Sequence, residues 1–254
     1  MGASSGFGAA SSLELAARGF NILGVHLDTR STLPKAQELV AKLQGMGRTA
    51  IFFNMNAADA AKRQGALDKM KEALKQSEKV DVLIHSLAFG SLKPYVAREG
   101  EESVTQAQME MTLNVMANSL VYWVQDLVKR QMLGNGGRIF ALTSAGSRRA
   151  VRYYGAVSAA KAALESHIRQ LAFELAPQGV AANAIRAGVT DTPALRKIPG
   201  NQEMMARAQA RNPQGRMTRP EDVAKAIGLL SEPGAYWITG NVVGVDGGEE
   251  TVGF

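Results

Sequence analysis

Short apolar runs of strand length alternate with amphipathic helical patterns along the chain. One run, NILGVHL at 21–27, precedes KAQELVAKLQGMG at 35–47, a helical pattern that is closed by glycines, as helix ends often are. The alternation continues to the end of the chain. It predicts further strands at 49–56, 79–90, 136–144, 180–188 and 241–248, further helices within 1–20 and at 60–76, 104–133, 155–176 and 220–230, and an irregular, partly helical segment at 193–213.

Strands that alternate with helices imply a parallel sheet with helices on both faces. No internal repeat, low-complexity linker or shift in composition marks a second domain in the 254 residues. We therefore expect a single domain over 1–254 with a doubly wound, Rossmann-like α/β fold and a mostly parallel sheet.

The first strand of such a fold is not found in the sequence. A glycine-rich loop that opens a helix normally follows that strand, which lies centrally in a doubly wound sheet. Here Met1 stands directly before Gly2, inside the loop. Because a central gap would leave backbone groups unpaired, we expect the natural protein to continue upstream of Met1.

The composition limits the class of protein. Apolar residues make up 46% of the chain and charged residues 20%, as in ordinary globular proteins. No apolar run approaches about 18 residues and no signal peptide is recognisable, so we expect a cytoplasmic protein without a membrane segment. Zero cysteines exclude disulfides, and the three histidines lack metal-ligand spacing. The net charge of +6 is spread along the chain, which favours an anionic ligand or acidic partner over nucleic acid.

The stretch TSAGSRRAVRYYGAVSAAK at 143–161 leaves an expected strand and enters a helix that carries Tyr154 and Lys161. Seven helical residues turn through about 700°, so the two side chains lie within ~20° of one face and about 10 Å apart along the axis. Ser144 stands at the preceding strand end. A phenol and an ammonium placed in this way can touch two parts of one long ligand, which suggests a site that handles protons or hydride.

Gly2, Gly6 and Gly8 form a G-x-x-x-G-x-G pattern at the start of the first helix. Glycines allow the backbone to approach a pyrophosphate closely, and the helix N-terminus supplies unpaired N–H groups and partial positive charge. A glycine-rich turn without a ligand would show the same pattern. Its position at the head of the strand and helix series favours a nucleotide site.

Two charged residues bear on the choice of nucleotide. Asp28 lies 20 residues after Gly8, about where an acid would hold the adenosine ribose of NADH. Arg30 is close by and could instead bind the 2′-phosphate of NADPH. Both side chains could also be solvated turn charges. We expect NADPH or NADH as the cofactor, with NADPH slightly favoured.

The chain resembles the short-chain dehydrogenase/reductase family over nearly its whole length. The resemblance implies an NAD(P)H-dependent oxidoreductase that assembles as a homotetramer. The residue that commonly precedes the glycine loop in the family is threonine, and here it is Met1. The matching stretches are GASSGFG at 2–8, HSLA at 85–88, Asn114, Ser144 with Lys161, IRAGVTDTP at 185–193, NPQGRMTRPEDVA at 212–224 and GNVVGVDGG at 240–248.

Three features resemble the enoyl-acyl-carrier-protein reductase branch of this family. Most members place the catalytic tyrosine four residues before the lysine, where this chain has Val157. Tyr154 lies seven residues before Lys161 instead, which is the spacing of the enoyl reductases. HSLAF and the pair Ala187-Gly188 point the same way. Ser144 departs from the branch, because many enoyl reductases have a tyrosine there and the ketone-reducing enzymes have a serine. Tyr153 adjoins Tyr154 and competes with it for the assignment.

The resemblance implies a role for each candidate residue. Tyr154 would donate a hydrogen bond to the thioester oxygen, and Lys161 would bind the nicotinamide ribose. Ser144 would bond the same carbonyl or simply end a strand. Asn114 would stabilise a kink or hold a water near Lys161, and Thr192 would contact the cofactor or cap a helix before Pro193. The expected cofactor site comprises Gly2, Ser4, Ser5, Gly6, Phe7, Gly8, Asp28, Arg30, Asn56, Ser86, Lys161, Gly188 and Thr192.

The segment 193–213 mixes apolar and basic side chains just after the expected strand at 180–188. Such a segment would form a lid over an acyl chain, with a basic rim for an acidic acyl carrier protein. A plain surface helix is the alternative.

We expect NAD(P)H-dependent reduction of an enoyl thioester in fatty-acid synthesis. The alternatives are a carbonyl reductase or hydroxysteroid-type alcohol dehydrogenase of the same family, and a non-catalytic nucleotide-binding module.

Overall fold

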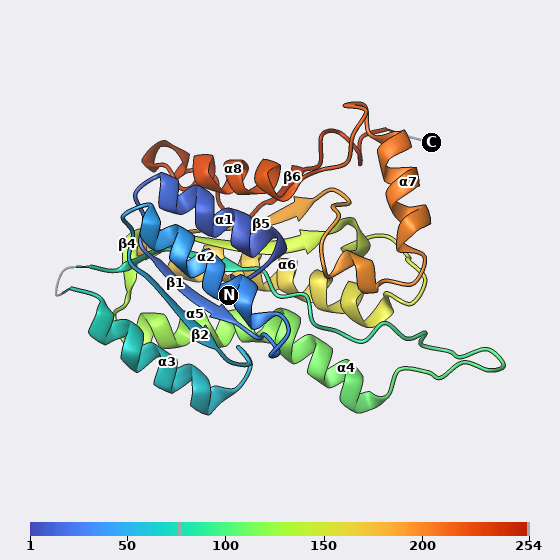
Figure 1. The fold of residues 1–254 in the computed structure, drawn as a ribbon, viewed down its shortest axis with the longest axis horizontal. Coiled ribbons are helices and arrows are strands. Elements are labelled where there is room, and N and C mark those ends of the chain that lie inside the picture. Colours follow the sequence, from blue (N-terminus) through green and yellow to red (C-terminus); the bar gives the residue numbers. More distant parts are fainter. Residues whose placement is uncertain (76–77, 253–254) are drawn as a thin grey trace.

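The computed structural model describes residues 1–75 and 78–252, in which six strands alternate with helices (Figure 1). The strands are β1 Ile22–His26, β2 Ala50–Asn54, β3 Val80–His85, β4 Leu133–Ser144, β5 Ala181–Ala187 and β6 Val242–Val245. The helices are α1 Gly6–Ala17, α2 Leu33–Gly45, α3 Ala60–Ala73, α4 Gln106–Leu113, α5 Ser119–Lys129, α6 Gly155–Leu175, α7 Asn201–Arg211 and α8 Pro220–Leu230, with a π-helical turn at Asn114–Asn118.

All strand pairs are parallel, and the strands form two separate groups. β1 pairs with β2, while the second group has the order β3-β4-β5-β6. Among the described residues no strand lies between β1 and β3. The amino-terminal residues bridge these strands at their carboxyl ends only, where the Met1 amino group donates to Ile84 O (2.7 Å) and Gly2 N donates to Val25 O (2.8 Å). The expected doubly wound α/β fold is confirmed.

Helices cover both faces of the strands (Figure 1). On one face α1 and α2 pack on β1 and β2, and α8 packs beside α1 on β4 and β5. The other face carries α3, α5 and α6, whose apolar side chains form the largest buried cluster.

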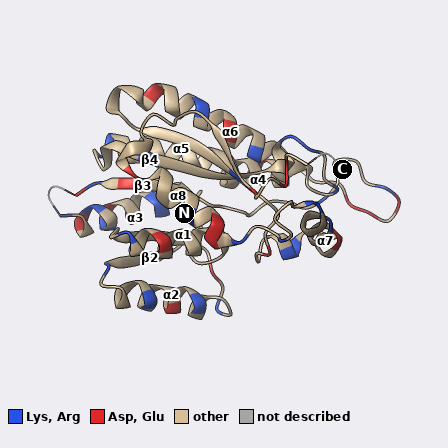
Figure 2. Ribbon diagram, turned by 90° about the horizontal axis from the view of Figure 1, so that it is seen from above, with Lys and Arg blue, Asp and Glu red and all other residues tan. Residues whose placement is uncertain are grey.

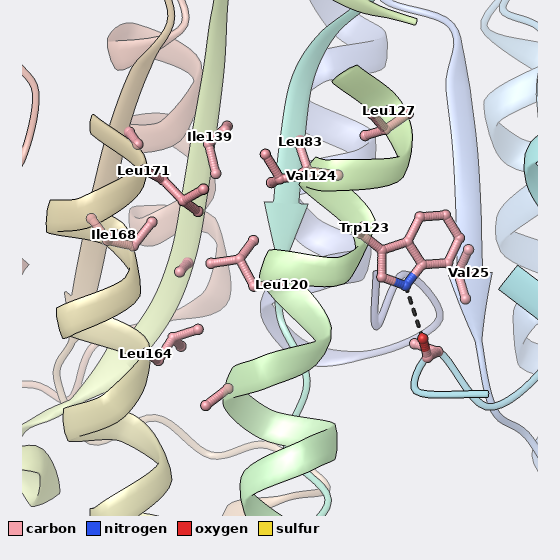
Figure 3. Close-up of a cluster of buried hydrophobic side chains, with 14 of the residues drawn as sticks. Val25, Leu83, Leu120, Trp123, Val124, Leu127, Ile139, Leu164, Ile168 and Leu171 are labelled. Carbon is pink, nitrogen blue, oxygen red and sulfur yellow. Dashed lines mark hydrogen bonds between the residues drawn. The ribbon is translucent and has the colours of Figure 1, made fainter. Parts of the chain in front are cut away.

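That largest cluster joins two helices to the sheet (Figure 3). Leu120 and Leu164 point toward each other from α5 and α6, and Ile139 of β4, which has no exposed surface, lies beside Leu171 of α6. Trp123 is 2% exposed and donates its indole N–H to Ala57 O (2.9 Å), so its one polar atom is satisfied inside the core. This packing fixes the helix that carries Lys161 against the strand that ends at Ser144.

The long helix expected over 104–133 is interrupted and ends early. The π-helical turn separates α4 from α5, and α5 ends at Lys129 rather than at Gly134. Gln131 takes a left-handed conformation (φ 56°), with Gln131 N bonded to Val128 O and Met132 N bonded to Leu127 O. This is the Schellman arrangement that terminates helices, here without a glycine. The following strand therefore begins at Leu133, before its expected start at Gly136.

The other boundaries differ less from expectation. α3 ends at Ala73, and the expected end of that helix at 76 lies outside the described residues. α6 stops at Leu175, before Pro177, as expected. None of the helices in the described part of the chain has the length and apolarity that a bilayer crossing requires.

Candidate active site

Ser144 and Tyr154 meet at the carboxyl end of β4. Ser144 is the last residue of that strand, and its Oγ lies 3.5 Å from the Tyr154 hydroxyl. Gly146 allows this approach, because a Cβ at that position would lie 2.6 Å from Cε1 of the Tyr154 ring. Burial raises the pKa of the Tyr154 phenol, and the hydrogen bond with Ser144 lowers it by a smaller amount. The phenol is therefore protonated at neutral pH and available as a donor.

Tyr154 is not inside the helix, which corrects the sequence expectation. α6 begins at Gly155, and Tyr154 is its N-cap residue with φ −100° and ψ 3°. The reason lies one residue earlier, where Tyr153 has a left-handed backbone (φ 62°) that a helix cannot include. Lys161 is still two turns further along α6.

Tyr153 has a different partner from Tyr154. Its hydroxyl donates to Glu101 Oε1 (2.6 Å), and the Arg152 guanidinium lies 4.7 Å from its ring centroid. Glu101 belongs to the irregular segment between β3 and α4, so Tyr153 holds that segment against the start of α6. Between the two adjacent phenols, the contact with Ser144 belongs to Tyr154.

Lys161 is buried behind this pair, with 5% of its surface exposed. Its Nζ donates to Leu142 O (2.6 Å) and Leu87 O (3.2 Å), which are backbone groups near the carboxyl ends of β4 and β3. Burial lowers the pKa of Lys161 to about 8, while the charge of Glu165 acts to raise it. The ammonium is thus held next to the switch point of the strands by two carbonyls.

Glu165 is a residue that the sequence reasoning missed. It is 8% exposed, lies one turn after Lys161 on α6, and accepts a hydrogen bond from Thr143 Oγ1 (2.7 Å). The spacing of four residues along the helix was the signal that could have found it. The hydrogen bond between Thr143 and Glu165 ties α6 to β4 beside the candidate site.

The glycine loop has the close approaches that a nucleotide cradle needs. Gly2 has φ 75°, and a Cβ there would overlap the carbonyl oxygen of Ser86. A Cβ at Gly8 would overlap the carbonyl oxygen of Gly2. α1 starts directly after Ser5, whose side chain makes no cap bond, so the first N–H groups of this 12-residue helix face outward. The loop and helix fit the pyrophosphate of a dinucleotide.

Asp28 follows β1 beside this loop. Its carboxylate lies 2.7 Å from His26 Nδ1. Burial acts to raise the pKa of Asp28, but hydrogen bonds from Thr32, Ser4 and His26 outweigh it and lower that pKa. Asp28 is therefore ionised, and its carboxylate lies near Ser4 of the glycine loop. Arg30 is exposed two residues further on.

Three other expected cofactor residues have structural roles as well. Ser86 N donates to Met1 O (3.0 Å), and a Cβ at Gly188 would overlap Thr218 Oγ1. Thr192 Oγ1 accepts from Leu195 N (3.2 Å), the first residue of the short helical turn Leu195–Lys197. Its Cγ2 would also lie 3.5 Å from a Cβ at Gly6, which places Thr192 against the glycine loop.

The remaining expected residues lie at the edge of the candidate site. Asn56 is exposed and accepts from Ala58 N (2.9 Å) in the turn before α3. Phe7 is half-buried and packs against the cluster under α8. Asn114 is the first residue of the π-helical turn, which packs against α6. It therefore lies at the helix irregularity that the sequence suggested.

His85 is fully buried at the end of β3 and bonds Ser119 Oγ (2.9 Å). Burial, with the nearby charge of Lys161, lowers the pKa of His85 well below its usual range. It is neutral and enclosed, so it shapes the site and has no access to solvent as a base. Within residues 1–75 and 78–252, no group of three His, Asp or Glu side chains offers a metal site.

A family model described as enoyl-(acyl carrier protein) reductase matches residues 2–250. The chain belongs to this family. Its members are short-chain dehydrogenases/reductases, so the protein is an oxidoreductase with an NAD(P)-binding Rossmann-like fold.

The relatives of this short-chain reductase differ in activity. It is 30% identical to 1-cyclohexenylcarbonyl-CoA reductase of Streptomyces collinus over 253 residues, covering 97% of the chain and 84% of that protein. It is 28% identical to an NADPH-dependent aldehyde reductase-like chloroplastic protein of Arabidopsis thaliana, covering 97% and 91%. The fold matches an enoyl reductase of Anaplasma phagocytophilum solved with NAD, with a TM-score of 0.83 and 21% identity, covering 100% of the chain and 90% of that structure.

The segment 193–213 of this reductase contains the turn Leu195–Lys197 and α7. Leu195 and Ile198 are each 9% exposed, so they anchor the segment on the protein. Its basic residues are largely paired with acids: Arg196 with Asp191 at 2.7 Å, and Arg207 with Glu203 at 2.5 Å. Figure 2 shows both basic and acidic residues along α7.

Glu250 joins this segment to the candidate site. It contacts Arg211 at the end of α7 (2.8 Å) and Arg149 in the segment that leads to Tyr154 (3.2 Å). The sequence offers no spacing that would predict this contact, since 39 residues separate Arg211 from Glu250.

Proposed function

We propose that this reductase uses NADH or NADPH to reduce the carbon–carbon double bond of an enoyl thioester. The observation that carries the proposal is Val157, which occupies the position four residues before Lys161. It is 5% exposed and packed in the main core, and it has no proton to give. The phenol near the site is that of Tyr154, seven residues before the lysine, at the position that enoyl reductases use.

Tyr154 would act on the developing charge. When hydride reaches the β-carbon of an enoyl thioester, negative charge develops on the thioester oxygen. A phenol that donates a hydrogen bond to that oxygen stabilises the charge, and one such donor contributes about 3 kcal/mol. The raised pKa of Tyr154 keeps the donor proton in place at neutral pH.

Lys161 would serve the cofactor side of the site. Its ammonium would bind the ribose hydroxyls next to the nicotinamide, and its charge would favour the phenolate side of any proton transfer from Tyr154. Gly2, Gly8 and the start of α1 would hold the pyrophosphate. A bound NADH or NADPH supplies the hydride.

The comparisons support this proposal at two points. The matching family model is described as an enoyl reductase, and the name of the Streptomyces relative describes reduction of an unsaturated acyl-CoA.

Asp28 favours NADH and Arg30 favours NADPH, with NADPH retained as the slightly preferred cofactor.

Carbonyl reduction is the second candidate, and Ser144 favours it. A serine whose Oγ lies 3.5 Å from the tyrosine hydroxyl suits a ketone or aldehyde, whose oxygen both groups can bond. The aldehyde reductase-like relative supports this candidate. Ser144→Ala should impair carbonyl reduction at least tenfold while enoyl reduction changes by less than about threefold.

Purified protein separates the two functions. Oxidation of NADH or NADPH is followed at 340 nm with crotonyl-CoA and, separately, with acetoacetyl-CoA. Turnover of crotonyl-CoA alone supports the enoyl reductase, and turnover of acetoacetyl-CoA alone overturns it in favour of the carbonyl reductase. Tight nucleotide binding without turnover of either substrate would indicate a non-catalytic nucleotide-binding module.

A further inference from the structure

A cavity of about 600 Å³ lies beside the candidate site, and we call it the loop cavity. One wall is formed by the loop 93–104 between β3 and α4, which extends past α4 in Figure 1. The other wall is formed by the segment 150–159, which leads into α6. A cavity of this size holds a small organic ligand.

The loop 93–104 has contacts that fix it as a wall. Val104 N donates to Pro94 O (2.8 Å), which joins the two ends of the loop. The Tyr95 ring lies against Gly155 at the start of α6, where a Cβ would be only 2.7 Å from Tyr95 Cζ. A ligand of the loop cavity would therefore bind to a site that is already formed, which lowers the ordering cost of binding.

The interior of the loop cavity is mainly apolar. Pro94, Val96 and Val151 contribute to its lining, and Val96 is 84% exposed, so a ligand there would remove apolar surface from water. Ser158 also lines the cavity, but its hydroxyl already donates to Gly146 O. Such a lining suits an uncharged chain that carries methyl groups.

Two guanidinium groups and one carboxylate belong to the same lining, those of Arg98, Arg152 and Glu101. The carboxylate already has three donors. Glu101 Oε1 accepts from the Tyr153 hydroxyl (2.6 Å) and from Arg152 Nη2 (3.4 Å), and Glu101 Oε2 accepts from Arg98 N (3.1 Å). The Arg152 side chain remains 68% exposed. The lining thus has an excess of one positive charge, which favours an anion.

The loop cavity begins next to the proposed proton donor. Arg152 lies two residues before Tyr154, and two residues span at most about 7 Å. Ser158 lies one helical turn after Tyr154, so it lines the cavity on the side nearest the phenol. A substrate held at Tyr154 can therefore extend into the cavity.

Thioesters of coenzyme A and of acyl carrier proteins share one arm, phosphopantetheine. It is an uncharged chain with two geminal methyl groups and a phosphate at the end far from the sulfur. About a dozen bonds, at roughly 1.2 Å of extended length each, make the arm about 15 Å long. This length is enough to pass from Tyr154 to the guanidinium groups of Arg98 and Arg152.

We propose that the loop cavity binds the phosphopantetheine arm of the substrate, with the phosphate between Arg98 and Arg152. The proposal rests on the proposed function, because it requires a thioester substrate. The apolar lining covers the dimethyl part of the arm, and the guanidinium groups donate charge-assisted hydrogen bonds to the phosphate oxygens.

Direct binding tests the loop cavity without turnover. Phosphopantetheine and pantetheine, which lacks the phosphate, are titrated onto the full chain by calorimetry. Phosphopantetheine should bind at least about tenfold more tightly, and the double variant Arg98→Gln/Arg152→Gln should reduce that difference to within about twofold. Arg169→Gln removes an exposed charge of α6 outside the cavity lining and is the matched control, which should keep the difference. Equal binding of the two probes to the unchanged protein would overturn the proposal.

This result is separate from the outcome for the proposed function. A tenfold preference for phosphopantetheine in a protein that reduces no enoyl thioester would support the loop cavity as a site and contradict the proposed reaction. Reduction of crotonyl-CoA together with equal binding of the two probes would support the reaction and overturn the site.

Steady-state kinetics identify the carrier that delivers the arm. KM for crotonyl-CoA and KM for a crotonyl group on a carrier protein should each rise at least about fivefold in the double variant, because both substrates have the phosphate. The larger kcat/KM in the unchanged protein then identifies the preferred carrier. An equal rise of KM for crotonyl-pantetheine, which lacks the phosphate, would overturn the assignment of Arg98 and Arg152 to that group.

Discussion

Tyr153 and Tyr154 are neighbours in the chain but have separate surroundings. The Tyr153 hydroxyl is bonded to Glu101, whereas the Tyr154 hydroxyl lies near Ser144. A left-handed backbone at Tyr153 turns the chain between them. The two phenols can therefore be tested against each other with the same substitution.

Tyr154→Phe should lower kcat for crotonyl-CoA at least tenfold, because the donor to the thioester oxygen is lost while the ring stays. Tyr153→Phe is the matched control and should leave kcat within about twofold. Steady-state kinetics at 340 nm measure both. A larger loss in the Tyr153 variant would move the assignment of the proton donor to Tyr153.

The charge of Lys161 should make nucleotide binding depend on pH. The folded pKa of about 8 lies below the ordinary value of 10.5, so the lysine loses its proton as the pH rises through about 8. Loss of the ammonium should weaken NAD(P)H binding by roughly tenfold between pH 7 and pH 9.5. Fluorescence titration of bound NAD(P)H measures this.

Lys161→Met is the control for that titration. It should bind weakly at every pH and show no inflection near 8. An unchanged inflection in the variant would assign the titration to another group.

Much of the site at the residue scale could be predicted from the sequence. Ser144 lies at the strand end where the sequence placed it, with its Oγ near the Tyr154 hydroxyl. The i to i+7 spacing placed Tyr154 and Lys161 within one helix, whereas Tyr154 precedes α6. The pairs of Tyr153 with Glu101 and of Arg149 with Glu250 depend on how distant loops pack, and local patterns carry no information about that. Glu165 lies four residues after Lys161, and this helical spacing indicates that the two side chains are neighbours.

At the scale of the element, the end of α5 departs from its sequence pattern. The apolar pattern continued to Leu133, but the helix ends at Lys129 because Gln131 adopts φ 56°. Periodicity shows which face of a helix is buried and does not show where a non-glycine residue enters the left-handed region. The apolar pattern does not show the π-helical turn at Asn114–Asn118 either, since its sequence remains helical in character, and a kink at Asn114 was implied only by the family resemblance.

Gln131→Gly should stabilise the protein by about 1 kcal/mol, because glycine adopts the left-handed conformation without the strain of a side chain. Urea denaturation followed by circular dichroism measures the free energy of unfolding. Gln131→Val serves as the contrasting variant and should destabilise by a similar or larger amount. Equal stability of the two variants would contradict the role assigned to this residue.

At the scale of the whole molecule, the positive charge is less concentrated than the sequence of 193–213 suggested. Arg196, Arg207 and Arg211 of this segment each contact an acid. The exposed residue Arg148 lies in the segment before α6 and supplies positive charge nearer to the proposed site, while Arg152 in the same segment contacts Glu101 (3.4 Å). We propose that this combined rim attracts an acidic acyl carrier protein.

Salt should weaken that attraction selectively. KM for a crotonyl group on an acidic carrier protein should rise several-fold between about 50 mM and 500 mM NaCl, because salt screens exposed charges. Crotonyl-pantetheine, which has no charge, is the control and should show little change. A flat response with the carrier-bound substrate would remove electrostatic docking from the proposal.

The alternation of apolar runs predicted the layered α/β architecture because burial on both sheet faces imposes it. The strands form two groups, and Met1 and Gly2 contact β3 and β1 at their carboxyl ends. The basic residues of 193–213 could be counted from the sequence, but their acidic partners could not. Ion pairing depends on tertiary contacts, and net charge does not reveal it.

Glu250 connects α7 with the segment that leads to Tyr154, and a substrate in the proposed site would lie near both. Its carboxylate contacts Arg211 of α7 and Arg149, five residues before Tyr154. An acyl chain long enough to displace α7 must therefore break an ion pair or pull on the segment that positions the phenol.

We expect kcat to fall with acyl length more steeply than KM rises. Glu250→Gln should reduce that length dependence in kcat measured from crotonyl-CoA to dodecenoyl-CoA. Glu250 would then make the rate of the chemical step depend on acyl-chain length without touching the acyl chain itself.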